Sequence, residues 1–292
     1  MLVFVRGKDS RRETMKDMRV MVIGAHPDDA DLNFGGTAIK FAQAGAKVRF
    51  VSVCNGSKGH RDLSESALAA RRFCEMQRAA AILGIEKYET LGCPDCELEP
   101  TMEWRKELTR VIRRFSPHLI FTHRTCDYHA DHRAVGQLVM DATYFLVVPH
   151  WCPDVPEPLV YPAVFFLRDK FTVPRAMRPD VTVDITDVAD QVLDALSCHE
   201  SQFFEWLPPE IPGCVEANPG VGGSAEAKRE FIRRFWFLGH KEYDMQRFRL
   251  PFKYGEVFEM SEYGAQLTAE QLRDMFPAGA IVPERKISEY KC

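Results

Sequence analysis

Short apolar runs alternate with longer amphipathic stretches along the first half of the chain. Residues 19–25 (RVMVIGA) form a β-rich apolar run that closes on small residues, which is typical of a buried strand bounded by a turn. A helix is predicted to open at Gly35 and to run to Gly45, and residues 47–53 (KVRFVSV) predict the next strand. This strand–helix–strand order predicts parallel pairing through a right-handed crossover.

The same alternation continues to residue 147. Apolar positions at helical spacing predict helices, and short apolar runs between turn residues predict strands. The further elements predicted in this way are helices at 66–83, 104–115 and 131–147 and strands at 87–91 and 118–122. The whole pattern predicts an α/β fold, with a Rossmann-like, mostly parallel sheet flanked by helices.

The texture of the chain changes after residue 149. Prolines become frequent between positions 149 and 179, and aromatic residues crowd positions 203–258. The elements predicted here are strands at 160–167 and 181–185 and a helix at 187–199. We therefore expect three parts, of which the last packs on the core as a lid or a subunit contact. They are a polar N-terminal tail (1–18), a Rossmann-like core (19–205) and a C-terminal elaboration (206–292).

The bulk composition excludes several classes of protein. The chain has 292 residues, of which 46% are hydrophobic, enough for a sizeable core. No apolar run approaches the roughly 18 residues that a membrane helix requires, and the N-terminus lacks the apolar segment of a signal peptide. A formal net charge of -4 and the absence of a long basic run argue against a nucleic-acid partner. Nine cysteines without a framework spacing fit reduced thiols, so a cytoplasmic protein is expected.

Histidine and aspartate residues follow two of the predicted strands directly. His26, Asp28 and Asp29 come after the first strand. Others follow the strand at 118–122 within ten residues, namely His123, Asp127, His129, Asp131 and His132. Ligands of open α/β sheets bind outside the carboxyl ends of the strands, and imidazole and carboxylate groups are ligands that zinc accepts. Either group alone is weak evidence, but the two together predict one metal site.

These two segments resemble a known family. Residues 25–31 (AHPDDAD), followed by residues 35–37 (GGT), resemble the AHPDD-x-[DE]…GGT signature of the PIG-L/LmbE-like zinc-dependent N-acetylglucosaminyl de-N-acetylases. Residues 129–136 (HADHRAVG) are similar to the H-x-D-H-x-x-V-G segment of the same family. Weaker similarities extend the resemblance over residues 19–205.

The resemblance implies a metal site and a base. Zinc would be bound by His26, Asp29 and His132, and Asp28 would be the general base. Zinc with three protein ligands keeps a position open for water and can lower the pKa of that water from about 15.7 to about 7. An aspartate is ionised at neutral pH and can accept the proton.

The resemblance also implies residues that act on the substrate. His129 would be a general acid or would stabilise the oxyanion, and Asp131 would orient His129. Arg72 and Asp95 would face substrate hydroxyls. Structural alternatives stay open, because Asp131 also suits the first turn of a helix and Asp95 suits a turn. Arg72 could likewise pair with Glu75 on a solvated helix face.

Residues near position 200 have two interpretations each. His199 ends a predicted helix, where it is either a favourable cation or a neighbour of the active site. Aromatic residues at this density are more typical of a core or subunit interface than of a sugar-stacking platform. The aromatic residues concerned are Phe203, Phe204, Trp206, Trp236 and Phe237.

Three hypotheses follow for the function. The first is a zinc-dependent hydrolase that removes the N-acetyl group from an N-acetylglucosamine-type sugar or glycoconjugate, its small-molecule partner. The second is a zinc amidase that acts on a thiol conjugate or a secondary metabolite. The third is a non-enzymatic binding protein stabilised by zinc, although structural zinc sites favour four protein ligands and cysteine. The C-terminal elaboration is where a homo-oligomer contact would form.

Overall fold

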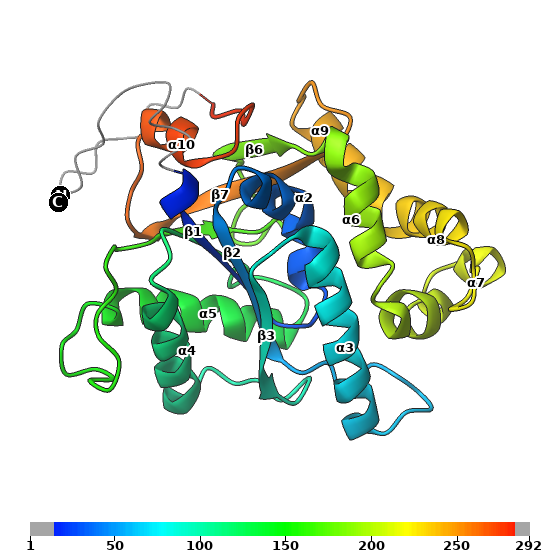
Figure 1. The fold of residues 1–292 in the computed structure, drawn as a ribbon, viewed down its shortest axis with the longest axis horizontal. Helices are drawn as coiled ribbons and strands as arrows, with labels where there is room; N and C mark the ends of the chain where they lie inside the picture. Colours follow the sequence, from blue (N-terminus) through cyan, green and yellow to red (C-terminus); the bar gives the residue numbers. More distant parts are fainter. Residues whose placement is uncertain (1–14, 284–292) are drawn as a thin grey trace.

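A seven-stranded sheet lies at the centre of the computed structural model, which describes residues 15–283 of the chain (Figure 1). The strands lie in the order β3-β2-β1-β4-β5-β7-β6. Their bounds are β1 (Arg19–Gly24), β2 (Lys47–Cys54), β3 (Lys87–Cys93), β4 (Leu119–Thr122), β5 (Ala163–Phe166), β6 (Val181–Asp184) and β7 (Gly255–Gly264). Strands β1 to β5 run parallel, and β7 is antiparallel to both of its neighbours. The predicted α/β fold with a mostly parallel sheet is confirmed.

Helices cover both faces of this sheet (Figure 1). One face carries α2 (Asp29–Gln43), α3 (Glu65–Leu83) and α6 (Ala189–Leu196), and the other carries α4 (Met102–Phe115) and α5 (Ala130–Phe145). Strand β1 shows how the sequence produces two cores, because alternate side chains of a strand point to opposite faces. Val20 and Val22 join the apolar cluster on the side of α2, whereas Met21 and Ile23 join the cluster on the side of α4.

The ends of the helices follow from local sequence. The hydroxyl of Ser64 accepts a hydrogen bond from the N–H of Ala67 at the start of α3, and Gly84 ends the helix with a φ of 70°. Thr101 caps α4 in the same way. The bounds of α3, α4 and α5 agree with the predicted bounds to within two residues.

The first helix is longer than predicted. Helix α2 begins at Asp29, directly after β1, whereas the sequence predicted a start at Gly35. Gly36 lies inside the helix, where an added Cβ would be 2.5 Å from Cγ2 of Ile185. Gly36 is therefore explained by close packing against the residue after β6, and Gly35 by packing against Val192 of α6 (3.3 Å), not by the start of a helix.

Residues on both sides of position 205 build the sheet. Strand β7 comes from the expected C-terminal elaboration and pairs with β5 and β6. The buried carboxylate of Glu256 in β7 accepts hydrogen bonds from the N–H groups of Gly36 (3.1 Å) and Thr37 (2.8 Å) and from Nζ of Lys241 (3.1 Å). This segment therefore completes the core, while its role as a lid or a subunit contact stays a prediction.

Packed structure also begins before β1. Met15 and Met18 are buried in the core. The other residues of the expected tail, 1–14, lie outside the described residues.

The predicted helix at 187–199 is a 3-10 turn followed by α6. The remaining short elements are η1 (Thr186–Val188), η2 (Ser201–Trp206), η3 (Pro208–Glu210), α7 (Cys214–Ala217), α8 (Ala225–Ile232), η4 (Arg233–Glu242), α9 (Tyr243–Arg247) and α10 (Ala269–Met275). Across residues 15–283, no helix has the length and apolar character needed to cross a membrane.

Candidate active site

A cavity of about 630 Å³ opens at the carboxyl ends of the parallel strands. The loops after all five of these strands contribute to its wall, as expected for a ligand site of an open α/β sheet. Residues that represent these loops are Asp28 after β1, Lys58 after β2, Asp95 after β3, His129 after β4 and Lys170 after β5. A further wall comes from the segment that contains η2 and η4.

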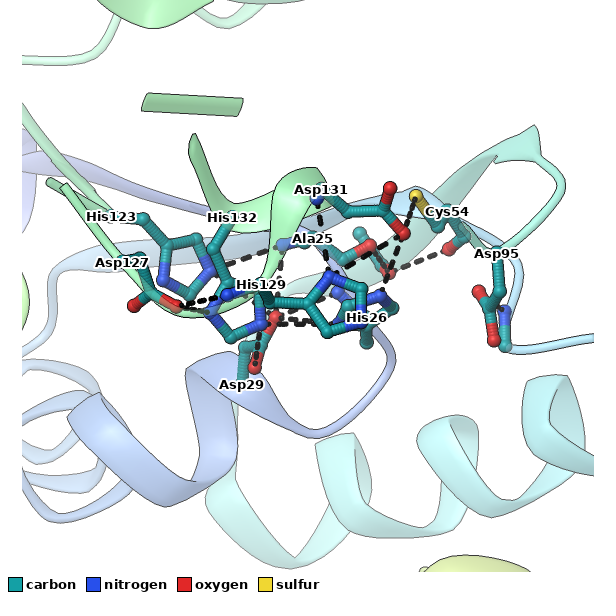
Figure 2. Close-up of polar contacts among 12 residues, drawn as sticks. Ala25, His26, Asp29, Cys54, Asp95, His123, Asp127, His129, Asp131 and His132 are labelled. Atoms are coloured by element: carbon teal, nitrogen blue, oxygen red, sulfur yellow. Dashed lines mark hydrogen bonds and ion pairs between the residues drawn. The ribbon is translucent and has the colours of Figure 1, made fainter. Parts of the chain in front are cut away.

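His26, Asp29 and His132 point toward one another (Figure 2), and all three line the cavity. Nδ1 of His26 lies 3.2 Å from Nε2 of His132, and Oδ1 of Asp29 lies 3.4 Å from the same nitrogen. Oδ2 of Asp29 lies 3.5 Å from Nδ1 of His26. Ligands that are 2.0–2.2 Å from a tetrahedral metal ion are about 3.3–3.6 Å apart, so these three donors have close to the spacing of a metal site.

The groups around these three residues hold the donor atoms in place. Oδ2 of Asp29 accepts hydrogen bonds from the backbone N–H groups of Ala25 (3.0 Å) and His26 (2.7 Å). Oδ1 of Asp127 lies 3.2 Å from Nδ1 of His132, at an angle that departs from an ideal hydrogen bond. This contact leaves Nε2 of His132 facing the shared point. The sequence placed Asp127 in the cluster but assigned it no role.

The carboxylate of Asp131 lies between His26 and His129 and is closer to His26. Its Oδ2 is 3.1 Å from Nε2 of His26 and accepts a hydrogen bond from the N–H of Cys96 (2.7 Å), whereas it is 3.9 Å from Nδ1 of His129. Burial raises the pKa of Asp131, but the hydrogen bonds from His26 and Cys96 outweigh burial and lower it to about 2. The carboxylate is therefore placed to orient His26, which the sequence did not predict, while its role toward His129 stays a prediction.

His129 is the N-cap of α5. Its Nδ1 accepts a hydrogen bond from the backbone N–H of Asp131 (3.2 Å), so Asp131 itself is in the first turn of the helix. Burial and the neighbouring His26 and His132 lower the pKa of His129. A neutral ring whose Nδ1 is an acceptor carries its proton on Nε2, so His129 presents a hydrogen-bond donor at the cavity wall.

Asp28 occupies the N-cap position of α2 without capping it. Its side chain makes no capping hydrogen bond and instead lines the cavity. Burial and the adjacent Asp29 carboxylate raise the pKa of Asp28, while the charge of Arg72 opposes this rise. A carboxylate that is left out of the helix cap and has a raised affinity for a proton suits a general base.

Arg72 and Asp95 both line the cavity. Arg72 is buried, and its Nη2 donates a hydrogen bond to Oε1 of Gln202. Asp95 accepts hydrogen bonds from the N–H groups of Gly56 (2.8 Å) and Lys58 (3.3 Å), so it holds the loop after β2. Both residues are therefore at the predicted location, and Asp95 also has the structural role that the sequence left open.

The structural alternatives for the neighbouring residues are resolved by their contacts. Glu75 pairs with Arg71 (3.1 Å) and accepts a hydrogen bond from the hydroxyl of Ser201 (2.6 Å), so it is not the partner of Arg72. His199 is buried with Nε2 3.3 Å from Oδ1 of Asp31, behind the first loop. Four of the five aromatic residues are buried in the core, and Trp206 is the partly exposed one.

The structure is thus an α/β fold in which His and Asp side chains that could hold a metal ion cluster at the carboxyl ends of the parallel strands. The PIG-L family, described as GlcNAc-PI de-N-acetylase, matches residues 21–143. A diacetylchitobiose deacetylase from Thermococcus kodakarensis is 35% identical over 193 residues, which are 64% of this chain and 71% of that protein. The chain therefore belongs to the PIG-L family of de-N-acetylases.

Two further comparisons agree with this assignment. A probable N-acetyl-alpha-D-glucosaminyl L-malate deacetylase 2 from Bacillus anthracis is 26% identical over 198 residues, which cover 65% of this chain and 84% of that protein. The structure of an N,N'-diacetylchitobiose deacetylase from Pyrococcus horikoshii aligns with a TM-score of 0.64 at 24% identity, over 88% of this chain and 94% of that one. At this level of identity the structural match shows the shared fold.

Proposed function

We propose that this protein is a zinc-dependent hydrolase that removes the N-acetyl group from an N-acetylglucosamine-type sugar or glycoconjugate. The observation that carries the proposal is the convergence of His26, Asp29 and His132 beside a carboxylate, Asp28, that is free of its helix cap. Membership of a de-N-acetylase family supports the same reaction. Nitrogen and oxygen donors, without cysteine among the three, are typical of a catalytic zinc site with an open position.

The residues of the chain divide the work of amide hydrolysis. When three N/O ligands bind zinc, the ion supplies Lewis-acid polarisation of the acetyl carbonyl and activation of water. Asp28 takes the proton of the attacking water on its carboxylate, because its raised pKa makes it a better base than a free aspartate. The same carboxyl group returns this proton to the amide nitrogen as the C–N bond breaks, so that acetate and the amino sugar leave. His129 donates a hydrogen bond from Nε2 to the carbonyl oxygen, where negative charge develops. Asp131 and Asp127 hold the imidazole rings of His26 and His132.

The substrate-binding roles are proposed on the same basis. Arg72 presents buried guanidinium donors at the wall of the cavity, and Asp95 and Gln202 lie at the same wall. Charged and amide side chains in such positions match the hydroxyl groups of a sugar ring. They would hold the ring so that its acetamide group lies next to Asp28 and the metal centre.

Acetate release tests the proposal directly. Zinc-loaded protein is incubated with N-acetylglucosamine, diacetylchitobiose and a panel of N-acyl amines that includes N-acetylated thiol conjugates. We expect acetate from the sugars, loss of activity with a chelator, and recovery with zinc. Turnover of the thiol conjugates alone would favour the second hypothesis, and tightly bound zinc with no turnover of any compound would favour the third.

A matched pair of variants tests the base. Asp28→Asn should retain zinc and lose about 10²- to 10⁴-fold in kcat, the contribution that a positioned general base makes. Asp274→Asn makes the same change at an exposed position of α10 and should leave kcat unchanged. Full activity of the Asp28 variant would refute the assigned role.

A further inference from the structure

The wall of the cavity also carries basic side chains outside the metal-binding cluster. This basic wall is formed by the loop after β5 and by the π-helical segment η4, which contribute Arg168, Lys170 and His240. None of these residues takes part in the proposed hydrolysis. Loops after the strands of an α/β sheet and π-helical segments are both places where functional side chains concentrate.

Two of the three basic side chains have bonding capacity left over. Nε of Arg168 donates to the buried carboxylate of Asp244 (2.7 Å), so its charge is paired. Lys170 is exposed, and no ion pair joins it to any residue between 15 and 283. Nδ1 of His240 is buried and has no hydrogen-bond partner among the described residues.

The charges around His240 make this part of the cavity wall electropositive. Burial is the largest cause that lowers the pKa of His240, and the charges of Arg168, Lys241 and Lys170 lower it further, to about 3. The ring is therefore neutral at neutral pH and offers one N–H donor. Arg168 and Lys241 are each paired with a buried carboxylate, Asp244 (2.7 Å) and Glu256 (3.1 Å), so Lys170 supplies the unpaired positive charge near His240.

A further acidic side chain, Asp169, is paired with another residue. Asp169 lies between Arg168 and Lys170 in the sequence and also lines the cavity. Its Oδ2 is 2.7 Å from Nε of Arg124, and its Oδ1 accepts a hydrogen bond from the N–H of Phe171 (2.9 Å). The carboxylate is thus already paired. Other acids that line the cavity, such as Asp28 and Asp29, belong to the metal-binding cluster.

We propose that Lys170 and His240 form a second subsite, which binds an anionic group carried by the N-acetylated sugar. Lys170 would supply the unpaired charge on a flexible stem, and His240 a neutral hydrogen bond, which together suit a carboxylate or a phosphate. The inference rests on the proposed function only in that it takes the sugar as the substrate. It makes the preferred substrate an acidic glycoconjugate, in place of a neutral sugar.

Paired substrates test this subsite. Values of kcat/KM are measured for two anionic substrates, N-acetylglucosamine 1-phosphate and the carboxymethyl glycoside of N-acetylglucosamine. Each is compared with the neutral methyl glycoside of N-acetylglucosamine. We expect both anionic substrates to be favoured by about tenfold, the size of one hydrogen bond to a charged group. The preference should arise in KM and should shrink with added salt, which screens a partly exposed charge. Equal kcat/KM for all three substrates would overturn the proposal.

Variants separate the subsite from the chemistry. Lys170→Gln should remove most of the preference and leave turnover of the methyl glycoside unchanged. The matched control Lys47→Gln makes the same charge change at the amino end of β2, whereas the cavity lies at the carboxyl ends of the strands, and it should preserve the preference. If the two variants behave alike, the subsite is refuted. His240→Asn should raise KM for the anionic substrates only.

A binding measurement keeps the inference independent of the proposed reaction. The affinity of N-acetylglucosamine 1-phosphate is measured by calorimetry with the Asp28→Asn protein, both zinc-loaded and after chelation, so that direct contact of phosphate with the metal is recognised. Weaker binding in the Lys170→Gln background of both forms supports the subsite even if no acetate is released. Turnover of neutral sugars together with binding that ignores Lys170 would reject the subsite and leave the proposed function intact.

Discussion

Removal of the Asp127 carboxylate should weaken metal binding without unfolding the protein. Oδ1 of Asp127 lies 3.2 Å from Nδ1 of His132, and both side chains are about one-tenth exposed. At an effective dielectric constant of about 20, two unit charges 3.2 Å apart interact by about 5 kcal/mol, which is an upper bound for an imidazole that carries only part of a charge. Carboxylates that support a metal-binding histidine typically change metal affinity by about 10- to 100-fold, or about 1.4–2.7 kcal/mol.

Two substitutions separate charge from orientation. Asp127→Asn keeps an oxygen that can accept from His132 and loses the charge, so its zinc affinity should fall less than that of Asp127→Ala. The same oxygen accepts the backbone N–H of His129 (2.9 Å), so the alanine variant also frees the N-terminus of α5. Asp274→Ala, at an exposed position of α10, is the matched control.

Competition with a chromophoric chelator at fixed pH measures the affinity for zinc, and thermal unfolding of the metal-free proteins measures stability. We expect the order wild type, Asp127→Asn, Asp127→Ala in affinity, with unfolding temperatures that differ much less. An alanine variant that binds zinc within twofold of the wild type would refute the supporting role of Asp127. A drop in stability equal to the drop in affinity would show that the contact supports folding instead.

Two further predictions concern stability. Gly36→Ala should lower the free energy of unfolding by about 1–3 kcal/mol, because its Cβ would meet Ile185 at 2.5 Å. The control Gly222→Ala adds a Cβ with no atom within 4 Å and should change the free energy of unfolding little. Urea titrations compare the two variants. Burial, followed by the charge of Arg19, lowers the pKa of His118 from 6.5 to about 4. Between these values the unfolded chain binds the proton and the folded chain does not, so stability falls as the pH drops through this window, by about 1–2 kcal/mol after allowance for partial exposure. His118→Asn should flatten that slope in metal-free protein, and an unchanged slope would contradict the assignment.

The parts of the fold that depend on local patterns were predictable from the sequence. Strands β1 to β5 and the helices between them appear as apolar runs and amphipathic stretches, because both faces of a parallel sheet are covered by the intervening helices. The position of β7 was not predictable in this way, since its pairing with β5 joins residues about a hundred positions apart. The start of α2 was misplaced because Gly36 looked like a helix boundary, while its actual constraint, Ile185, lies far along the chain.

The candidate site shows the same division between local and distant information. His26 and Asp29 are three residues apart, where the chain passes from β1 into α2, and the parallel pairing of β1 with β4 brings them close to His132 at the start of α5. The direction of a side chain is a different matter, because it depends on contacts that topology does not specify. Asp131 is next to His132 in sequence and two residues from His129, yet its carboxylate turns to His26, where the N–H of Cys96 also holds it.

The basic wall of the cavity was not predictable from sequence motifs. The signature residues report the chemistry that members of a family share, so they cluster on the loops of the candidate metal site. Lys170 and His240 lie on segments that no motif covers, and the ion pair between Arg168 on the loop after β5 and Asp244 just beyond η4 joins these segments at one wall of the cavity. Substrate choice can therefore change by substitutions at this wall while the catalytic loops stay fixed. This separation is why the reaction could be inferred from the sequence, whereas the proposal of an acidic substrate rests on the structure.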